Sequence, residues 1–249
     1  MEDRRFAGLD RLFGLTGARR IRQSHVAIIG VGGVGSWVAE SLARSGVGKL
    51  TLIDFDHVAE SNVNRQIHAT QATFGQAKVF AMRDRIHTYH PLCEITCIEE
   101  FATCSNWPEL LPEGVDAVID ACDQWKVKAV ISNWVVQHKV IFISSGAAGG
   151  KKHAHLVSVE DLSKVTHDPL LSKVRYELRK KFGAPQAGKK MRVPCVFSRE
   201  AVLPPHASCA LGSDGSLNCH GFGSLVTVTA TFGQCAASFV INELANKGD

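Results

Sequence analysis

The sequence predicts an α/β protein built on a mostly parallel sheet that is flanked by helices. Short apolar runs alternate with helical patterns along the first half of the chain, which is typical of βαβ units. The chain has 249 residues, of which 45% are hydrophobic and 21% are charged, enough for the core of one large domain. This composition excludes a disordered or fibrous chain. We therefore expect a single domain over residues 1–249.

The expected elements of the first half are apolar runs of strand length separated by segments with helical periodicity. The predicted strands are 25–29, 49–53, 94–98, 117–120 and 140–144. The predicted helices are 34–44, 76–87 and 125–137. A polar loop, 54–73, follows the second strand. Alternation in this order indicates parallel strands joined by helices.

The second half has a different character. We expect a strand within 153–159, a charged helix at 171–182, a loop at 183–205 rich in Gly, Pro and Lys, and a closing C-terminal helix at 224–246. The length and glycine content of the loop make it a candidate lid. An uncharged run, 221–242, is long enough to raise the question of a membrane span. It contains Ser, Thr, Gln, Asn and three glycines, so a buried helix is the better interpretation.

The chain also carries a basic insertion. Lys and Arg number 28 against 24 Asp and Glu, and the net charge of +4 by itself indicates no particular partner. Residues 173–192, however, contain eight basic residues and one acid, +7, which leaves −3 for the rest. A basic segment on a mildly acidic body indicates a polyanionic partner that binds at one place.

Eight cysteines occur without any CxxC pair, so we expect no zinc site. The first five residues, Met-Glu-Asp-Arg-Arg, contain no apolar signal core. We therefore expect a cytoplasmic protein with free thiols.

A glycine-rich loop directly follows the first predicted strand and opens the first predicted helix. It reads Gly30-Val31-Gly32-Gly33-Val34-Gly35. Glycines let the backbone turn tightly and approach a phosphate, and the helix N-terminus supplies free N–H groups. Asp54 follows the second strand, 24 residues after Gly30, where a carboxylate can hold ribose hydroxyls. The combination predicts a Rossmann-like nucleotide site rather than glycines that serve helix–sheet packing alone.

Further polar residues indicate which nucleotide binds. Those that follow the second strand are Asp56, Asn62, Arg65, Gln66 and Lys78. Cationic side chains near a nucleotide suit a triphosphate, because they offset the charge that develops on pyrophosphate as it leaves. Two more acids, Asp120 and Asp123, stand at the end of the strand 117–120 and offer oxygen ligands to Mg²⁺. We therefore expect ATP and Mg²⁺.

These residues resemble the ubiquitin-activating-type superfamily, whose bacterial members adenylate the C-termini of small sulfur-carrier proteins. The segments that carry the resemblance are Gly30–Gly35, Asp54-Phe55-Asp56, Asn62-Val63-Asn64-Arg65-Gln66, Gly75-Gln76-Ala77-Lys78 and Asp120 with Asp123. The resemblance implies that Asp54 binds ribose and that Asp123 binds Mg²⁺. It also implies that Asn62, Arg65 and Lys78 surround the phosphates.

The same resemblance implies a homodimer in which an N-terminal arginine completes the ATP site of the partner. Arg11 matches that position best, with Arg5 as the second choice. Arg11 would then be a catalytic residue together with Arg65, Lys78 and Asp123. The alternative is that Arg11 is a solvated residue on an amphipathic first helix.

The chain resembles one branch of the superfamily more narrowly, the tRNA threonylcarbamoyladenosine dehydratases. The segments that carry this resemblance are Arg5-Phe6, 10–14, 144–149, 189–198 and 221–224. The branch uses ATP to close the threonylcarbamoyl group next to the anticodon into a ring, so tRNA is the implied partner. Residues 1–150 would be the nucleotide-binding half and 151–249 the substrate side, and the basic segment would contact tRNA.

Three other functions stay open. An NAD-dependent dehydrogenase would use the glycine loop and Asp54 but leave Arg65 and Lys78 without a role. A non-catalytic binding module would need none of the phosphate-site residues. Adenylation of a ubiquitin-like sulfur-carrier protein is the main alternative. The enzymes that activate such carriers usually hold a zinc ion with two CxxC pairs, which this chain lacks, and a carrier protein would not need the basic segment.

Cysteine chemistry and further ligands also stay open. Cys195 or Cys235 would be the reactive thiol if a thioester formed or a cysteine desulfurase supplied sulfur. Buried, unreactive thiols are the more common case. A monovalent cation near the site is a further option that no spacing demonstrates.

Overall fold

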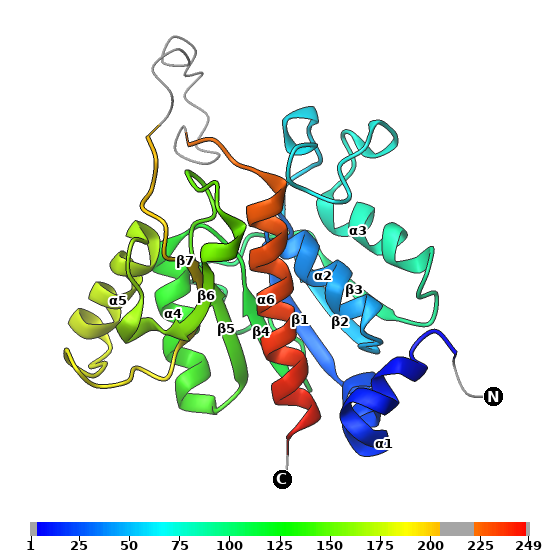
Figure 1. Ribbon diagram of the computed structural model, residues 1–249, viewed down its shortest axis with the longest axis horizontal. Helices are drawn as coiled ribbons and strands as arrows, with labels where there is room; N and C mark the ends of the chain where they lie inside the picture. Colours follow the sequence, from blue (N-terminus) through cyan, green and yellow to red (C-terminus); the bar gives the residue numbers. More distant parts are fainter. Residues whose placement is uncertain (1–3, 205–221, 248–249) are drawn as a thin grey trace.

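The computed structural model describes residues 4–204 and 222–247. Its centre is a seven-stranded sheet with the order β3-β2-β1-β4-β5-β7-β6 (Figure 1). Every neighbouring pair is parallel except β6 and β7, which are antiparallel. The strands are β1 His25–Ile29, β2 Lys49–Ile53, β3 Glu94–Ile98, β4 Ala117–Asp120, β5 Ile141–Ser145, β6 Val157–Asp161 and β7 Pro194–Ser198.

Helices cover both faces of this sheet, so the chain forms three layers. The helices are α1 Ala7–Gln23, α2 Gly35–Arg44, α3 Lys78–His87, α4 Trp125–His138, α5 Pro169–Lys181 and α6 Val226–Ala245. Helix α6 packs beside α2 and also contacts α1, while α4 and α5 pack together on the other face (Figure 1). The predicted α/β, Rossmann-like class with a mostly parallel sheet is confirmed.

The residues of β1 explain why both faces are covered. Val26 and Ile28 point into a core shared with α2, α3 and α6, whereas Ala27 and Ile29 point into a core shared with α4 and α5. All five residues of the strand are buried. A strand that is apolar on both sides is stable only between two helical layers, which is typical of a parallel sheet.

The first half of the fold agrees with the sequence expectation. Strands β1 to β4 have the predicted bounds, and β5 is shifted by one residue. Helices α2, α3 and α4 begin and end within two residues of their predicted positions. Each of these elements alternates with another along the chain, and that pattern is visible in a single sequence.

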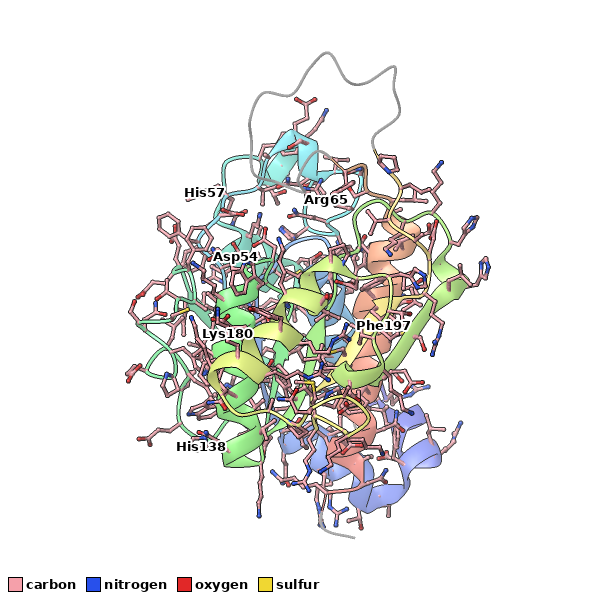
Figure 2. The ribbon with its side chains drawn as sticks, turned by 90° about the vertical axis from the view of Figure 1, so that its left-hand side faces the viewer. Asp54, His57, Arg65, His138, Lys180 and Phe197 are labelled. Carbon is pink, nitrogen blue, oxygen red and sulfur yellow. The ribbon has the colours of Figure 1, made fainter. Side chains whose placement is uncertain are left out.

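The second half contains the main correction. The expected loop 183–205 is not a loop throughout, because Pro194–Ser198 forms β7 between β5 and β6. Phe197, labelled in Figure 2, is fully buried in this strand. Glycine and lysine in the preceding segment concealed a short apolar run of strand length, Val193–Phe197. Residues 194–198 are therefore part of the sheet and cannot move as a lid.

The other strand of the second half lies later in the chain than expected. The strand expected at 153–159 begins later, at Val157, after a 3₁₀ turn at Ala154–Leu156. Among the described residues, no helix combines the length and the hydropathy that crossing a membrane requires. Residues 205–221 lie outside the described part of the chain, and they include Gly221, Cys209 and Cys219.

Candidate active site

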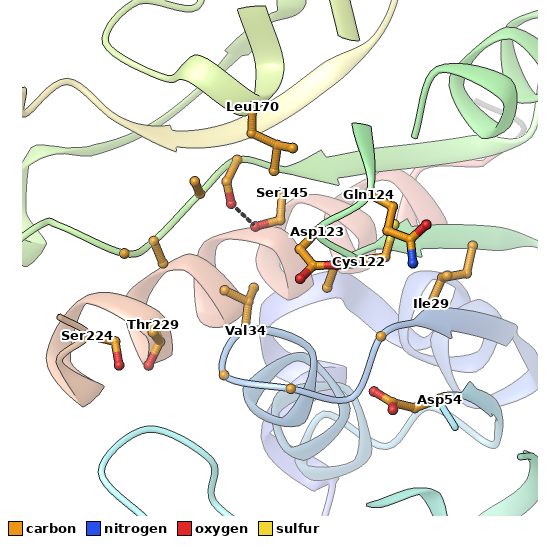
Figure 3. Close-up of a pocket in the computed structure, with 18 of the residues that line it drawn as sticks. Ile29, Val34, Asp54, Cys122, Asp123, Gln124, Ser145, Leu170, Ser224 and Thr229 are labelled. Carbon is orange, nitrogen blue, oxygen red and sulfur yellow. Dashed lines mark hydrogen bonds between the residues drawn. The ribbon is translucent and has the colours of Figure 1, made fainter. Parts of the chain in front are cut away.

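A cavity of about 330 Å³ opens at the carboxyl ends of the parallel strands. Its floor is formed by the loops that follow β1 and β4, the two central neighbours in the sheet. Strand order reverses between them, since the chain continues from β1 toward β2 and β3 and from β4 toward β5. Ligands of open α/β sheets bind at such a position. Asp54, Val34 and Thr229 come from three separate segments and surround the same cavity (Figure 3).

The glycine loop forms the edge of the cavity because it runs close to the loop after β4. Gly30 has φ +85°, and a Cβ there would lie 2.9 Å from the Ala121 carbonyl oxygen. Its amide donates to the Ile53 carbonyl oxygen at 2.8 Å. The loop then leads into α2 at Gly35, where the Ser36 and Trp37 amides already donate to the carbonyl oxygens of Gly32 and Val34 at 3.0 and 3.1 Å. A phosphate would therefore meet the backbone of the loop itself, whose Gly32 and Gly33 line the cavity. The arrangement is suited to a phosphate.

Asp54 connects the glycine loop to the end of β2. Its Oδ2 accepts a hydrogen bond from the Val31 amide at 2.6 Å, and its Oδ1 accepts one from the Asp56 amide at 2.8 Å. Burial raises the pKa of this carboxyl group, while Lys78 and the two amides oppose that shift. A desolvated carboxylate that lines a cavity is a strong acceptor for ligand hydroxyl groups.

Lys78 is the first residue of α3 and is almost fully buried. Its Nζ lies 2.7 Å from Asp56 Oδ2, and the Asp56 side chain is 42% exposed. The ammonium group is therefore held at the cavity by a partner that water can still reach. A polyanionic ligand in the cavity can also interact with the Lys78 ammonium group, because an ion pair with an exposed carboxylate costs little free energy to weaken.

The segment between β2 and α3 supplies the remaining polar side of the cavity. Arg65 Nη1 donates to the Ser61 carbonyl oxygen at 2.7 Å and to Asn64 Oδ1 at 3.0 Å. The Arg65 carbonyl oxygen accepts a hydrogen bond from the indole of Trp37 at 3.0 Å, which ties the segment to α2. Arg65 is thereby positioned without an ion pair to any described carboxylate.

Two buried amide side chains stand beside it. Asn62 Oδ1 accepts from the Ala59 amide at 3.1 Å, which leaves its Nδ2 to donate elsewhere. Gln66 is buried, and its Oε1 has no hydrogen-bond partner among the described residues. A buried polar atom without a partner is costly, so Gln66 Oε1 is suited to accept from a polar ligand in the cavity.

The two acids at the end of β4 have different roles. Asp120 is fully buried and pairs with the fully buried Lys128, whose Nζ lies 3.1 Å from Asp120 Oδ2. Ser144 donates to the same carboxylate oxygen at 3.0 Å. Asp123 is exposed and lines the cavity (Figure 3). Asp120 Oδ1 accepts from the Cys122 amide at 3.2 Å, and Asp120 does not line the cavity. Of the two acids, only Asp123 lies where a ligand in the cavity could reach it, and its expected role in binding Mg²⁺ stays a prediction.

The opposite wall is formed by residues that were not among those expected to bind the nucleotide. The loop 145–149 lines the cavity, and the buried Asp168 holds it by accepting from the Ala147 amide at 2.9 Å. Burial raises the pKa of Asp168. Lys173 of α5 and Thr229 of α6 complete this wall. No sequence signal marked Lys128 or Asp168, because each looks like one more surface charge.

Most of the expected site residues lie together. Those that line the cavity are Gly30, Gly32, Gly33, Asp54, Asp56, Asn62, Arg65, Gln66, Lys78 and Asp123. Arg11 is exposed on α1 and does not line it, nor does Gly35. Arg5 donates to the Tyr89 carbonyl oxygen at 2.9 Å.

The candidate thiols are not exposed nucleophiles. Cys195 is fully buried in β7, and burial raises its pKa well above the usual range. Cys235 is partly buried in α6, and burial raises its pKa as well. In the parts of the chain that are described, no three His, Cys, Asp or Glu side chains gather as a metal site would require.

Fold and cavity together define a class, the α/β nucleotide-binding proteins whose site lies at the switch point of a mostly parallel sheet. Within that class, residues 5–248 match the model of the ThiF family. The chain belongs to the ThiF family.

Relatives in this family match almost the whole chain. A tRNA threonylcarbamoyladenosine dehydratase of Haemophilus influenzae is 40% identical and covers 98% of this chain and 95% of the relative. The Escherichia coli protein of the same name is 38% identical and covers 98% of this chain and 94% of its own. A crystal structure of E. coli TcdA in complex with ATP superposes with a TM-score of 0.87, at 38% identity, over 96% of this chain and 93% of the other.

Proposed function

We propose that this protein uses ATP to dehydrate threonylcarbamoyladenosine next to the anticodon of tRNA, closing that group into a ring. The observation that carries the proposal is one cavity in which Asp54, Lys78, Arg65 and Asp123 converge. Its relatives over nearly the full chain are named as tRNA threonylcarbamoyladenosine dehydratases. The basic segment 173–192 supplies the charge that a tRNA requires.

ATP is proposed to lie across the carboxyl ends of β1 and β2. Asp54 accepts hydrogen bonds from the ribose hydroxyl groups, as the acid after the second strand does in such folds. The backbone of the glycine loop receives the phosphates. Asn62, Arg65 and Lys78 surround the same phosphates, because their donor groups line that side of the cavity.

Mg²⁺ is proposed to bind with the nucleotide at Asp123. The donor set fits, since Mg²⁺ in nucleotide sites commonly takes one or two carboxylates together with phosphate oxygens and water. Asp123 is the exposed acid after β4, and Asp120 is occupied by Lys128. When bound, the ion supplies positive charge to the phosphates.

The first step forms a better leaving group. A free carboxylate is a poor acyl donor, so the carboxylate oxygen of the threonylcarbamoyl group attacks the α-phosphorus of ATP. A bond forms between that oxygen and phosphorus, and the bond to the bridging oxygen of pyrophosphate breaks. Arg65 and Lys78 offset the negative charge that develops on the departing pyrophosphate. The product is an acyl-adenylate.

The second step closes the ring. A nitrogen or oxygen of the same threonylcarbamoyl group attacks the activated carbonyl carbon, an N–H of that group gives up its proton, and the bond to AMP breaks so that AMP leaves. The net change in the nucleoside is the loss of one water. Because the attack is intramolecular, positioning supplies much of the rate and a general base of unusual pKa is not required. Water has to be kept from the acyl-adenylate during this step, because it would hydrolyse that intermediate.

The assembly is proposed to be a homodimer in which Arg11 of each protomer reaches the ATP site of the other. Arg11 is exposed and lies outside the cavity of its own chain. Leu12 and Leu15 on the same helix are 74% and 72% exposed, an apolar surface that a partner would cover. A tRNA substrate implies that the enzyme acts in the cytoplasm.

The decisive experiment measures nucleotide and nucleoside products together. Purified protein is incubated with ATP, Mg²⁺ and tRNA that carries threonylcarbamoyladenosine, and the digested nucleosides are analysed by mass spectrometry. The proposal expects AMP, pyrophosphate and a nucleoside lighter by the mass of one water. ATP–pyrophosphate exchange only with a ubiquitin-like carrier protein would instead establish the alternative. Absence of AMP under both conditions would overturn adenylation altogether.

A further inference from the structure

Helix α5 has one buried face and one open face. Leu171, Val174 and Leu178 are buried in the core shared with α4. The opposite side exposes Lys173, Tyr176 and Lys180, which follow one another at helical spacings of three and four residues. We call these three residues the outer face of α5. In Figure 2 α5 crosses the side turned toward the viewer, and Lys180 is labelled on it.

The cations of the outer face differ from their basic neighbours, because the neighbours are already engaged. Lys181 pairs with Glu177 at 2.6 Å. Arg175 donates to the Leu162 and Val165 carbonyl oxygens, and Arg179 to that of Pro185. Those three side chains therefore serve the protein itself.

Neither Lys173 nor Lys180 has an ion-pair partner among the described residues, and Lys180 lies over an aromatic ring. The Lys180 ammonium lies 5.5 Å from the centroid of the Tyr176 ring. Tyr176 is 62% exposed, an unusual amount for a large aromatic side chain. Two lysines without an ion-pair partner, with an exposed aromatic ring between them, form a surface that can bind an anion whose planar rings stack on Tyr176.

The outer face continues directly from the cavity. Pro169, Leu170 and Lys173 of α5 line the cavity wall, whereas Tyr176 and Lys180 do not. Lys180 is seven residues beyond Lys173, which is about 10 Å along the helix axis. A chain that enters the cavity at Lys173 can therefore continue over Tyr176 to Lys180 without leaving the helix.

We propose that the outer face of α5 binds the single-stranded RNA next to the nucleotide that enters the cavity. One base stacks on Tyr176, and the lysines contact the flanking phosphates. Single-stranded RNA offers both groups, an unstacked base and closely spaced negative charges. An acidic protein surface would supply negative charge for the lysines but no nucleobase to stack on the Tyr176 ring. The inference rests on the proposed function and assigns the contact face of its substrate.

The test measures binding of tRNA, without turnover, as a function of salt concentration. Lys180→Ala should reduce the slope of log affinity against log salt by about 0.7, because one phosphate contact is lost. Tyr176→Ala should weaken binding about fivefold or more at every salt concentration and keep the slope, whereas Tyr176→Phe should bind as the wild type does. Lys164→Ala removes the same charge from a lysine already paired with Glu160, and it should match the wild type.

The affinity for ATP distinguishes a local effect from a folding defect. Tyr176 and Lys180 lie outside the cavity, so both variants should bind ATP as the wild type does. If wild-type protein binds tRNA but Lys180→Ala and Tyr176→Ala bind it equally well, the outer face is not the contact. If the wild-type protein does not bind tRNA but binds an acidic protein, both this inference and the proposed function fail. If tRNA binds normally but its nucleoside is unchanged, the function fails alone.

Discussion

Arg65 and Lys78 are held in the cavity in different ways. Lys78 is buried beside Asp56, whereas Arg65 is partly exposed and held by a backbone carbonyl and an amide side chain. Neither is needed to fill the hydrophobic core. Each can therefore be removed with more effect on the charge of the cavity than on the fold.

We predict that Lys78→Ala or Arg65→Ala lowers the rate of AMP release by about 100-fold or more, because stabilisation of the leaving pyrophosphate is lost. The melting temperature and circular dichroism spectrum should stay close to those of the wild type. Arg83→Ala is the matched control, since Arg83 is also on α3, does not line the cavity, and contacts the adjacent Asp84 and the Phe80 ring instead. Wild-type turnover in either cavity variant would refute the phosphate-site assignment.

His68 makes the stability of the fold dependent on pH. It is 1% exposed, and neither ring nitrogen has a hydrogen-bond partner among the described residues. Burial, together with Lys78 and Arg85, lowers its pKa from 6.5 to about 4. Between these values the unfolded chain binds the proton more readily than the folded one. The stabilising difference is therefore present above pH 6.5 and is lost as the pH falls toward 4.

This difference corresponds to on the order of 3 kcal/mol between the two ends of the pH range. We predict that His68→Phe flattens the dependence of the unfolding free energy on pH between 6.5 and 4, because Phe binds no proton. Urea denaturation at several pH values measures the effect. An unchanged pH profile in the variant would mean that other groups cause the acid sensitivity.

Helices α2 and α6 pack closely against each other at Gly233. A Cβ at Gly233 of α6 would lie 2.6 Å from the Trp37 Cβ and 2.8 Å from the Val34 carbonyl oxygen. The same stretch of α2 follows the glycine loop, and Trp37 also donates to the Arg65 carbonyl oxygen. The contact between these helices therefore fixes one side of the cavity.

We predict that Gly233→Ala destabilises the protein by about 1–3 kcal/mol, because the added methyl group overpacks the contact. The ATP affinity should fall as well, since Thr229 at the start of α6 lines the cavity. Gly8→Ala is the control, because a Cβ at Gly8 meets nothing within 4 Å. If Gly233→Ala kept the wild-type ATP affinity, α6 would not position the site.

The elements that the sequence predicted well are those that repeat a simple pattern. Strands β1 to β4 are apolar runs with polar boundaries, and the helices between them have an apolar face. Strand β7 was not predicted, because it is a short run that follows a segment rich in glycine and lysine. Pairing of such a run is decided by tertiary contacts, which no local window contains.

Part of the candidate site could also be predicted from the sequence. The glycine loop, Asp54 and the cations form an ordered set, and the structure brings that set to one cavity. The buried position of Lys128 could not be predicted, because the sequence does not distinguish it from a surface lysine. Only the structure shows its partner Asp120, 3.1 Å away. The sequence also could not show that α5 and α6 line the cavity, since more than 130 positions separate both helices from the glycine loop.

The proposed homodimer makes a prediction for the whole molecule. Arg11→Ala and Lys78→Ala protomers, each inactive alone, are mixed under conditions that let subunits exchange. If Arg11 acts in the partner's site, each mixed dimer has one intact site, and about a quarter of the wild-type rate should return on statistical exchange. Size-exclusion chromatography with light scattering checks that dimers are present. No recovery in mixed dimers would show that Arg11 does not act across the interface.

The position of α6 in the cavity wall has a consequence for synthesis of the protein. The glycine loop emerges from the ribosome early, whereas Thr229 emerges nearly two hundred residues later. Domains fold as their segments become available during translation. A nascent chain can thus form β1 and α2 and yet lack a closed nucleotide cavity. ATP turnover by this protein is therefore expected to begin only after α6 has docked, so unfinished chains would not consume ATP.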